Sequence, residues 1–151
     1  MALWDQLKSR LTDLQSTTKT QVAKYQSKDF AKASMAMCAL IAAADGTISP
    51  EERRKTAAFI SSNDALKVFE AIELQQHFDF YSSKLERDYD FGLVEAIATI
   101  GKLKRKPEAA RAVIQVGIII GGADGNFDPD EKQAVREACN AVGISPSEFD
   151  L

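Results

Sequence analysis

The stretch "MAMCALIAAADGTISPEERRK", Met35 to Lys55, joins an apolar segment to a charged one through an acidic turn. The part up to Ala44 carries no charge and is apolar almost all round, which is typical of a helix buried on every side. Gly46 follows it, at a position where helices favour a glycine that can turn left-handed. Ser49-Pro50-Glu51-Glu52 then has the pattern of a capping box with proline at the first helical position. The stretch therefore predicts a buried helix, a tight turn and a second, amphipathic helix.

The same skeleton occurs again in "GGADGNFDPDEKQAV", which begins at Gly121. Both copies read Ala-Asp-Gly, three residues, Pro, one residue, Glu and a base, and both follow an apolar run. We interpret this as an internal duplication, with repeat halves at about 29–61 and 107–142 packed about a pseudo-twofold axis. The run "VIQVGIII" before the second copy has the β-branched content of a strand. No second strand candidate exists to pair with it, so a helix is the consistent reading.

The rest of the chain also has helical spacing. An amphipathic helix is expected over residues 2–26, where apolar residues step by three and four: Trp4, Leu7, Leu11 and Leu14. The next predicted helix follows a cap at Ser27 or Asp29. Two more are marked by apolar stripes, the first by Leu74, Phe78, Tyr81 and Leu85, the second by Phe91, Val94, Ile97 and Leu103. The sequence predicts an all-α, single-domain bundle of about seven helices over residues 1–151.

Composition excludes several classes of function. A net charge of −3 and a pI of about 5.2 give no general attraction for a nucleic-acid backbone, so no nucleic-acid partner is expected. The sequence contains no window of about 20 apolar residues, so no membrane span is expected. The start "MALWDQLKSRL" mixes charges with apolar residues, unlike a signal peptide, so a cytoplasmic location is expected. The chain has one histidine and two cysteines, and the cysteines lack CxxC spacing. These residues are too few for a zinc site and do not indicate a nucleophilic relay, so a non-enzymatic protein is favoured.

Capping explains only part of the repeated skeleton. Asp45 and Asp124 fall at the C-terminal ends of predicted helices, where the helix dipole disfavours a negative charge. The second turn also alternates oxygen donors like the opening of a calcium loop, although glycine falls at loop position two and Val135 at position twelve. Two interpretations stay open: a purely structural turn, or a divalent-cation site. The cation would be calcium by preference, with magnesium or manganese as alternatives, and the candidate ligands are Asp45, Glu52, Asp124, Asp128, Asp130 and Glu131.

Three further features have plain structural interpretations. Cys38 and Cys139 fall on apolar faces, which predicts buried thiols; a redox role would need an exposed thiolate. The basic run Lys102–Lys106 either complements the dipole at the end of its own helix or contacts an anionic surface. Ser145-Pro146-Ser147-Glu148 has the pattern of a third capping box, without an Ala-Asp-Gly before it.

At the two Ala-Asp-Gly turns the sequence resembles the TerB family of tellurite-resistance proteins. The resemblance rests on "AAADGTISPEERRK" and "GGADGNFDPDEKQAVREA", on "KPEAARAVIQVGI" between them, and on the ending "SPSEFDL". It covers almost the whole chain, and the paired acidic turns are fairly specific for the family.

This resemblance implies an all-helical cytoplasmic protein that serves tellurium resistance and stress response. It implies a divalent-cation role for five acids: Asp45 and Glu52 at the first turn, and Asp124, Asp128 and Glu131 at the second. Ser49 stands where the second turn has Asp128. The partners it implies are other tellurium-resistance proteins, one of them membrane-embedded, through which the chain would reach the inner membrane. Related helical domains are attached to J-domain co-chaperones. The alternative is therefore a pure protein-interaction module without a bound ion.

Overall fold

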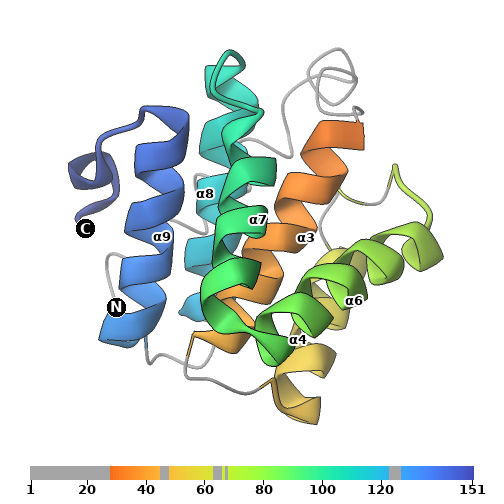
Figure 1. The fold of residues 1–151 in the computed structure, drawn as a ribbon. Helices are drawn as coiled ribbons and strands as arrows, with labels where there is room; N and C mark the ends of the chain where they lie inside the picture. The colour runs from red at the N-terminus through yellow and green to blue at the C-terminus, as the bar shows by residue number, and fades with distance from the viewer. Residues whose placement is uncertain (1–27, 45–47, 63–65, 67, 123–126) are drawn as a thin grey trace.

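Helices make up most of the described part of the chain, which in the computed structural model comprises residues 28–44, 48–62, 66, 68–122 and 127–151. Within these residues there is no strand, which confirms the predicted all-α class (Figure 1). The predicted helix at 2–26 lies outside the described residues. The elements in chain order are α3 (Lys28–Ala43), α4 (Pro50–Ser62), α6 (Ala71–Arg87), α7 (Tyr89–Gly101), α8 (Pro107–Gly121), α9 (Pro129–Val142) and the 3-10 helix η1 (Pro146–Phe149).

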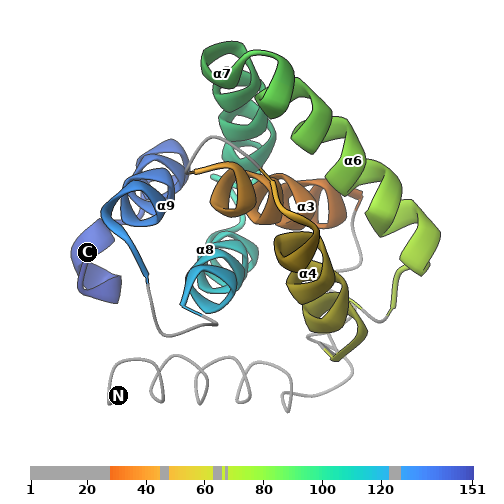
Figure 2. The ribbon, with the colours of Figure 1, turned by 90° about the horizontal axis from the view of Figure 1, so that it is seen from below.

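Helix α3 is the centre of the fold, as its apolar sequence predicts. Thirteen of its sixteen residues are buried, and Figure 2 shows it surrounded by α4, α6, α7, α8 and α9. The helix begins at Lys28. Asp29 therefore lies in the first turn and is not the N-cap, while the alternative cap, Ser27, lies outside the described residues.

Helix α8 is the second buried helix and packs beside α3. This rules out the strand interpretation of "VIQVGIII". The two helices approach closely at Gly117, where an added Cβ would lie 2.8 Å from Cγ of Met37. A glycine at this place makes room for the large, fully buried Met37 side chain.

The two repeat halves agree in element order but not in packing. Each half has a buried helix followed by a helix that begins at a proline, α3 and α4 in the first half and α8 and α9 in the second. Helix α9 packs along α7 and α8 and touches α3, whereas α4 makes few contacts with α3 or α8. Helix α4 instead reaches α6 through an ion pair between Arg53 and Asp79. The predicted pseudo-twofold axis therefore does not describe how the second helix of each half is placed.

Helix α7 faces the core with a different side from the one its apolar stripe indicates. Phe91 and Val94, two of the predicted markers, are 77% and 67% exposed. The buried side consists of small residues, Gly92 and Ala96, followed by Thr99 and Ile100. The helix also ends at Gly101, so the basic run lies in the turn beyond it rather than in its last turn.

Small residues on α7 allow a close crossing with α6. An added Cβ on Gly92 would lie 2.7 Å from the backbone Cα and N of Leu85. Further along, the Tyr81 hydroxyl and Thr99 Oγ1 are 2.7 Å apart in the core. Thr99 Oγ1 donates its proton to the carbonyl of Glu95 at 3.1 Å, so it accepts from Tyr81. The pair thereby satisfies two buried hydroxyls between the two helices.

Candidate functional site

The predicted cation ligands are described only in part. Asp45 and Asp124 lie outside the described residues, and Glu52 belongs to α4 without a described side chain. The three remaining candidates, Asp128, Asp130 and Glu131, lie at the start of α9. Among the described residues, no group of three or more His, Cys, Asp or Glu side chains is arranged to hold a metal ion.

Asp128 and Glu131 form the predicted capping box. Asp128 is the N-cap of α9, and its Oδ1 accepts from the backbone N–H of Glu131 at 2.8 Å. Glu131 Oε1 in turn accepts from the backbone N–H of Asp128 at 3.0 Å. Each carboxylate thus satisfies an amide that the helix leaves unpaired, and both charges lie at the positive end of the helix dipole. Two of the candidate ligands therefore have a structural role.

Replacing Asp128 by alanine is expected to lower the free energy of unfolding by about 1 kcal/mol, because the N-cap acceptor is lost. Urea titration followed by circular dichroism measures the change. Ser145→Ala is the matched control, since Ser145 makes no side-chain cap bond, and it is expected to have little effect. Equal losses from the two substitutions would contradict the assigned cap.

The third predicted capping box does not form. Residues Pro146–Phe149 make one 3-10 turn, and the Ser145 hydroxyl lies 2.7 Å from the Ser147 hydroxyl rather than on a backbone amide. Glu148 reaches across to α8, where its Oε2 accepts from Nε of Arg111 at 3.2 Å. The side chain needed for the box is thus engaged in an inter-helix ion pair.

The second carboxylate oxygen of Glu131 lies near the end of α8. An added Cβ on Gly121 would be 3.5 Å from Glu131 Oε2 and 2.9 Å from the ring of Phe127. Gly121 therefore allows the start of α9 to fold back closely on the end of α8. The Glu131 carboxylate therefore lies beside the C-terminal end of α8, the helix that precedes the second Ala-Asp-Gly sequence.

Asp130 belongs to a different group of acids, centred on Tyr89 at the start of α7. Burial raises the pKa of Tyr89, and the negative charges of Glu137, Asp130 and Asp90 raise it further, in that order. Asp130 and Glu137 are seven residues apart on α9 and so share one helix face. We call Asp90, Asp130 and Glu137 the acidic patch.

Sequence reasoning missed Tyr89, Asp90 and Glu137 as members of one group. The seven-residue spacing of Asp130 and Glu137 was the available signal on α9. The contribution of α7 depends on how α7 packs against α9, and no local pattern indicates that packing.

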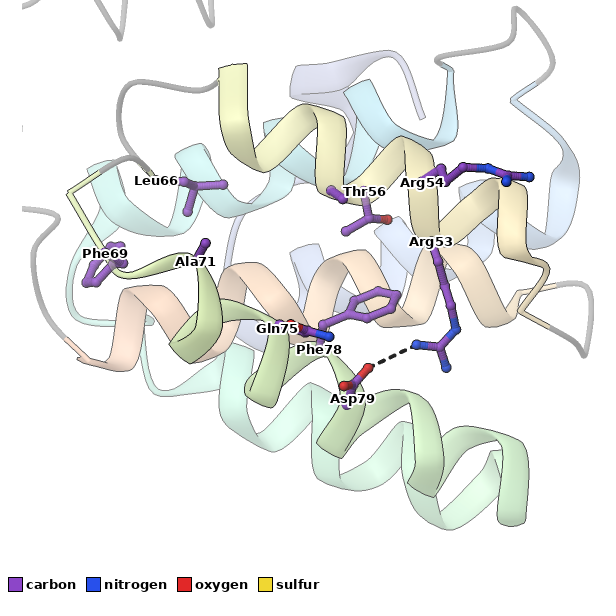
Figure 3. A pocket seen from close by; sticks show the side chains of 10 residues that line it. Arg53, Arg54, Thr56, Leu66, Phe69, Ala71, Gln75, Phe78 and Asp79 are labelled. Atoms are coloured by element: carbon purple, nitrogen blue, oxygen red, sulfur yellow. Dashed lines mark hydrogen bonds and ion pairs between the residues drawn. The ribbon is translucent and has the colours of Figure 1, made fainter.

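A pocket of about 550 Å³ lies between α4 and α6 (Figure 3). Its apolar lining includes Leu66, Phe69 and Phe78, and Arg53 lies at one end of the pocket. The guanidinium of Arg53 lies 5.6 Å from the centre of the Phe78 ring and pairs with Asp79 at 2.9 Å. Sequence reasoning did not find this pocket, because it depends on the placement of α4 against α6. Its lining suits an apolar group with a polar end.

The two thiols are buried, as predicted. Burial raises the pKa of Cys38 to about 12. It raises that of Cys139 to about 11, with a smaller contribution from the charge of Glu148. Both sulfurs are therefore protonated at neutral pH, and neither is the exposed thiolate that a redox role would require.

None of the helices in the described residues combines the length and the apolar character needed to cross a lipid bilayer.

The described residues define a class: an all-helical bundle around a buried helix, in which two helices that begin at a proline, α4 and α9, each follow an Ala-Asp-Gly sequence. Comparison with known proteins gives the family. The family model "Tellurite resistance protein TerB" matches residues 31–151, and the chain belongs to this family. A curated relative named "Tellurium resistance protein TerB", from Alcaligenes sp, is 35% identical over 118 residues, which cover 78% of this chain and 97% of the relative. No solved structure matches the chain.

Proposed function

We propose that this chain serves tellurite resistance as a non-enzymatic accessory protein, and that its acidic patch contacts a partner protein. The observation that carries the proposal is that Asp130 and Glu137 share one face of α9, which packs against α7. Their charges and that of Asp90 each raise the pKa of Tyr89 on α7. Family membership supports the role in tellurite resistance. Of the acids near the start of α9, Asp128 and Glu131 satisfy the helix end, whereas the capping box does not involve Asp130 or Glu137.

Like charges held near one another repel, and a positively charged partner relieves that repulsion. Membrane proteins carry an excess of Lys and Arg in their cytoplasmic loops. A basic loop of a membrane-embedded tellurium-resistance protein therefore has the charge that suits the acidic patch. Such a contact would hold a cytoplasmic protein at the inner membrane.

Binding of the purified chain to a purified membrane-embedded tellurium-resistance protein in detergent tests this proposal. The double substitution Asp130→Asn/Glu137→Gln is expected to weaken binding about tenfold, and rising salt should weaken the unsubstituted complex. The matched control is Glu70→Gln/Glu108→Gln, which neutralises two exposed acids at other helix starts. Equal affinities for the two double variants would refute the proposed contact.

A divalent cation at the second Ala-Asp-Gly turn is a second proposal, favoured by the Glu131 carboxylate beside the end of α8. Calcium is the preferred ion because the donors are all oxygen, with magnesium and manganese as alternatives. Calorimetry with the three ions tests it: binding heat for calcium that disappears in Asp124→Asn supports a site. If none of the three ions gives binding heat, the cation proposal is refuted. The alternative, a protein-interaction module without a bound ion, is then favoured.

Chelation separates the two proposals. If partner binding persists in the presence of a strong chelator, the acidic patch acts without an ion. If chelation abolishes partner binding and calcium restores it, the ion is part of the interface.

A further inference from the structure

The outer side of α7 carries a row of residues that the fold leaves on the surface. Asp90, Phe91, Val94, Ala98 and Lys102 are exposed and Gly101 is half-buried; we call these six residues the α7 outer stripe. Asp90, Val94, Ala98 and Lys102 are spaced by four, and Phe91 and Gly101 lie three residues from Val94 and Ala98. At about 100° per residue, all six share about a third of the helix circumference. Lys102 keeps helical backbone angles as the C-cap, so it continues the row.

The α7 outer stripe is polarised in both size and charge. Its N-terminal half has an acid followed by the large Phe91 and Val94, and its C-terminal half has Ala98, Gly101 and the base Lys102. Phe91 and Val94 are the most exposed large apolar side chains among the described residues. Next to the stripe, an apolar groove of about 460 Å³ between α7 and α9 extends the apolar surface through Leu93 and Ile97.

We propose that this stripe is the contact surface for a second copy of the chain, with the two α7 helices antiparallel about a twofold axis. The axis would pass level with Ala96. Asp90 then lies opposite Lys102 of the second copy, Phe91 opposite its Gly101, and Val94 opposite its Ala98. All three pairs share the same midpoint, so one axis satisfies them together.

Each of these pairs is complementary, and twofold symmetry makes each occur twice. A large side chain meets a small one in the two apolar pairs, which allows the helices to approach closely. The charges lie about 18 Å apart along each helix, so both ends of the contact gain an ion pair. The neighbouring acid, Glu95, is already paired with Lys84 of α6 at 3.1 Å and adds little repulsion near the axis.

The stripe favours a second copy over a basic partner segment. A basic segment laid along α7 would meet the acid at one end and the basic run at the other. An antiparallel copy of α7 matches both ends. A single helix face buries less surface than a standard interface, so the dimer is expected to be weak and to depend on concentration.

Sedimentation velocity of the full chain over a wide concentration range, at low salt, tests the proposal. A reversible monomer–dimer equilibrium is expected. Phe91→Asp should raise the dissociation constant at least about tenfold, since it removes the largest apolar side chain of the stripe and buries a charge in its place. Ile72→Asp on α6 is the matched control, because Ile72 is 62% exposed and lies outside the stripe; it should leave the constant unchanged. Circular dichroism checks that both variants are folded.

Charge exchange tests the antiparallel register. Asp90→Lys and Lys102→Asp should each raise the dissociation constant about tenfold at low salt, because each turns two attractions into repulsions. The double variant Asp90→Lys/Lys102→Asp should restore dimerisation. A chain that stays monomeric at the highest concentration, a dimer insensitive to Phe91→Asp, or a double variant no better than the single ones would overturn the proposal. Asp90 belongs to both surfaces, but the partner-binding test changes only Asp130 and Glu137 of α9, so failure of the dimer and failure of the partner contact are distinguishable.

Discussion

Substitution of Gly92 by alanine is expected to lower the free energy of unfolding by about 3 kcal/mol, the upper end of the usual cost of overpacking. The added Cβ would lie 2.7 Å from Cα and N of Leu85 and 2.9 Å from the carbonyl carbon of Lys84. These are backbone atoms of α6, so the clash cannot be relieved by a side-chain rotation. The clash can be relieved only if α7 moves away from α6, and this movement would also lengthen the hydrogen bond between the Tyr81 and Thr99 hydroxyls. Thermal and urea unfolding measure the loss.

Gly101→Ala is the control for this prediction. Gly101 lies at the end of the same helix, and its added Cβ would find its nearest neighbour at 3.7 Å, an ordinary contact. Alanine there should stabilise by up to about 1 kcal/mol through its better helix propensity. Both variants should be compared at low protein concentration, where the chain is monomeric. A Gly92→Ala protein as stable as the Gly101→Ala protein would contradict the close crossing of α6 and α7.

Stability is expected to fall in alkaline solution because of Cys38. Folding raises the pKa of this thiol from 9.0 to about 12, so above pH 9 the unfolded chain loses a proton that the folded chain keeps. The free energy of unfolding therefore keeps the full contribution of the protonated Cys38 thiol below pH 9. It loses that contribution as the pH rises towards 12. Between pH 9 and pH 11 the loss should be about 2–3 kcal/mol, at 1.36 kcal/mol for each pKa unit.

The Cys38→Ala variant isolates this effect from the titration of other groups. Its unfolding free energy should fall less steeply than that of the unsubstituted chain between pH 9 and pH 11. Cys139 remains as a second source of alkaline sensitivity in both proteins, since its pKa is also raised. Identical pH dependence of the two proteins would show that Cys38 is not held in a buried, protonated state.

The sequence predicts those elements whose signals are local. Prolines mark the starts of α4, α8 and α9, and the long apolar runs identify α3 and α8 as buried. The capping box at Asp128 follows from residue types at fixed spacing. The same pattern at Ser145 fails because Glu148 finds a charged partner on α8, a contact that no local pattern contains.

Features that depend on packing between helices could not be predicted in this way. Phe91 and Val94 suggest the buried side of α7, but the close approach to α6 requires the small residues on the opposite side. The acidic patch likewise combines residues of α7 and α9. The pocket lies between α4 and α6, and the sequence repeat does not indicate that these two helices are neighbours. Apolar periodicity finds a helix more reliably than it finds which side of a small-residue helix is buried.

Survival on tellurite tests the central claim, that the acidic patch serves resistance, most directly. Cells that carry the other tellurium-resistance genes but lack their own copy of this one would receive Asp130→Lys/Glu137→Lys or the control Glu70→Lys/Glu108→Lys, at matched protein levels. The first variant is expected to lose most of the resistance that the unsubstituted chain restores, and the control is expected to keep it. Full resistance from the Asp130→Lys/Glu137→Lys chain would contradict the account.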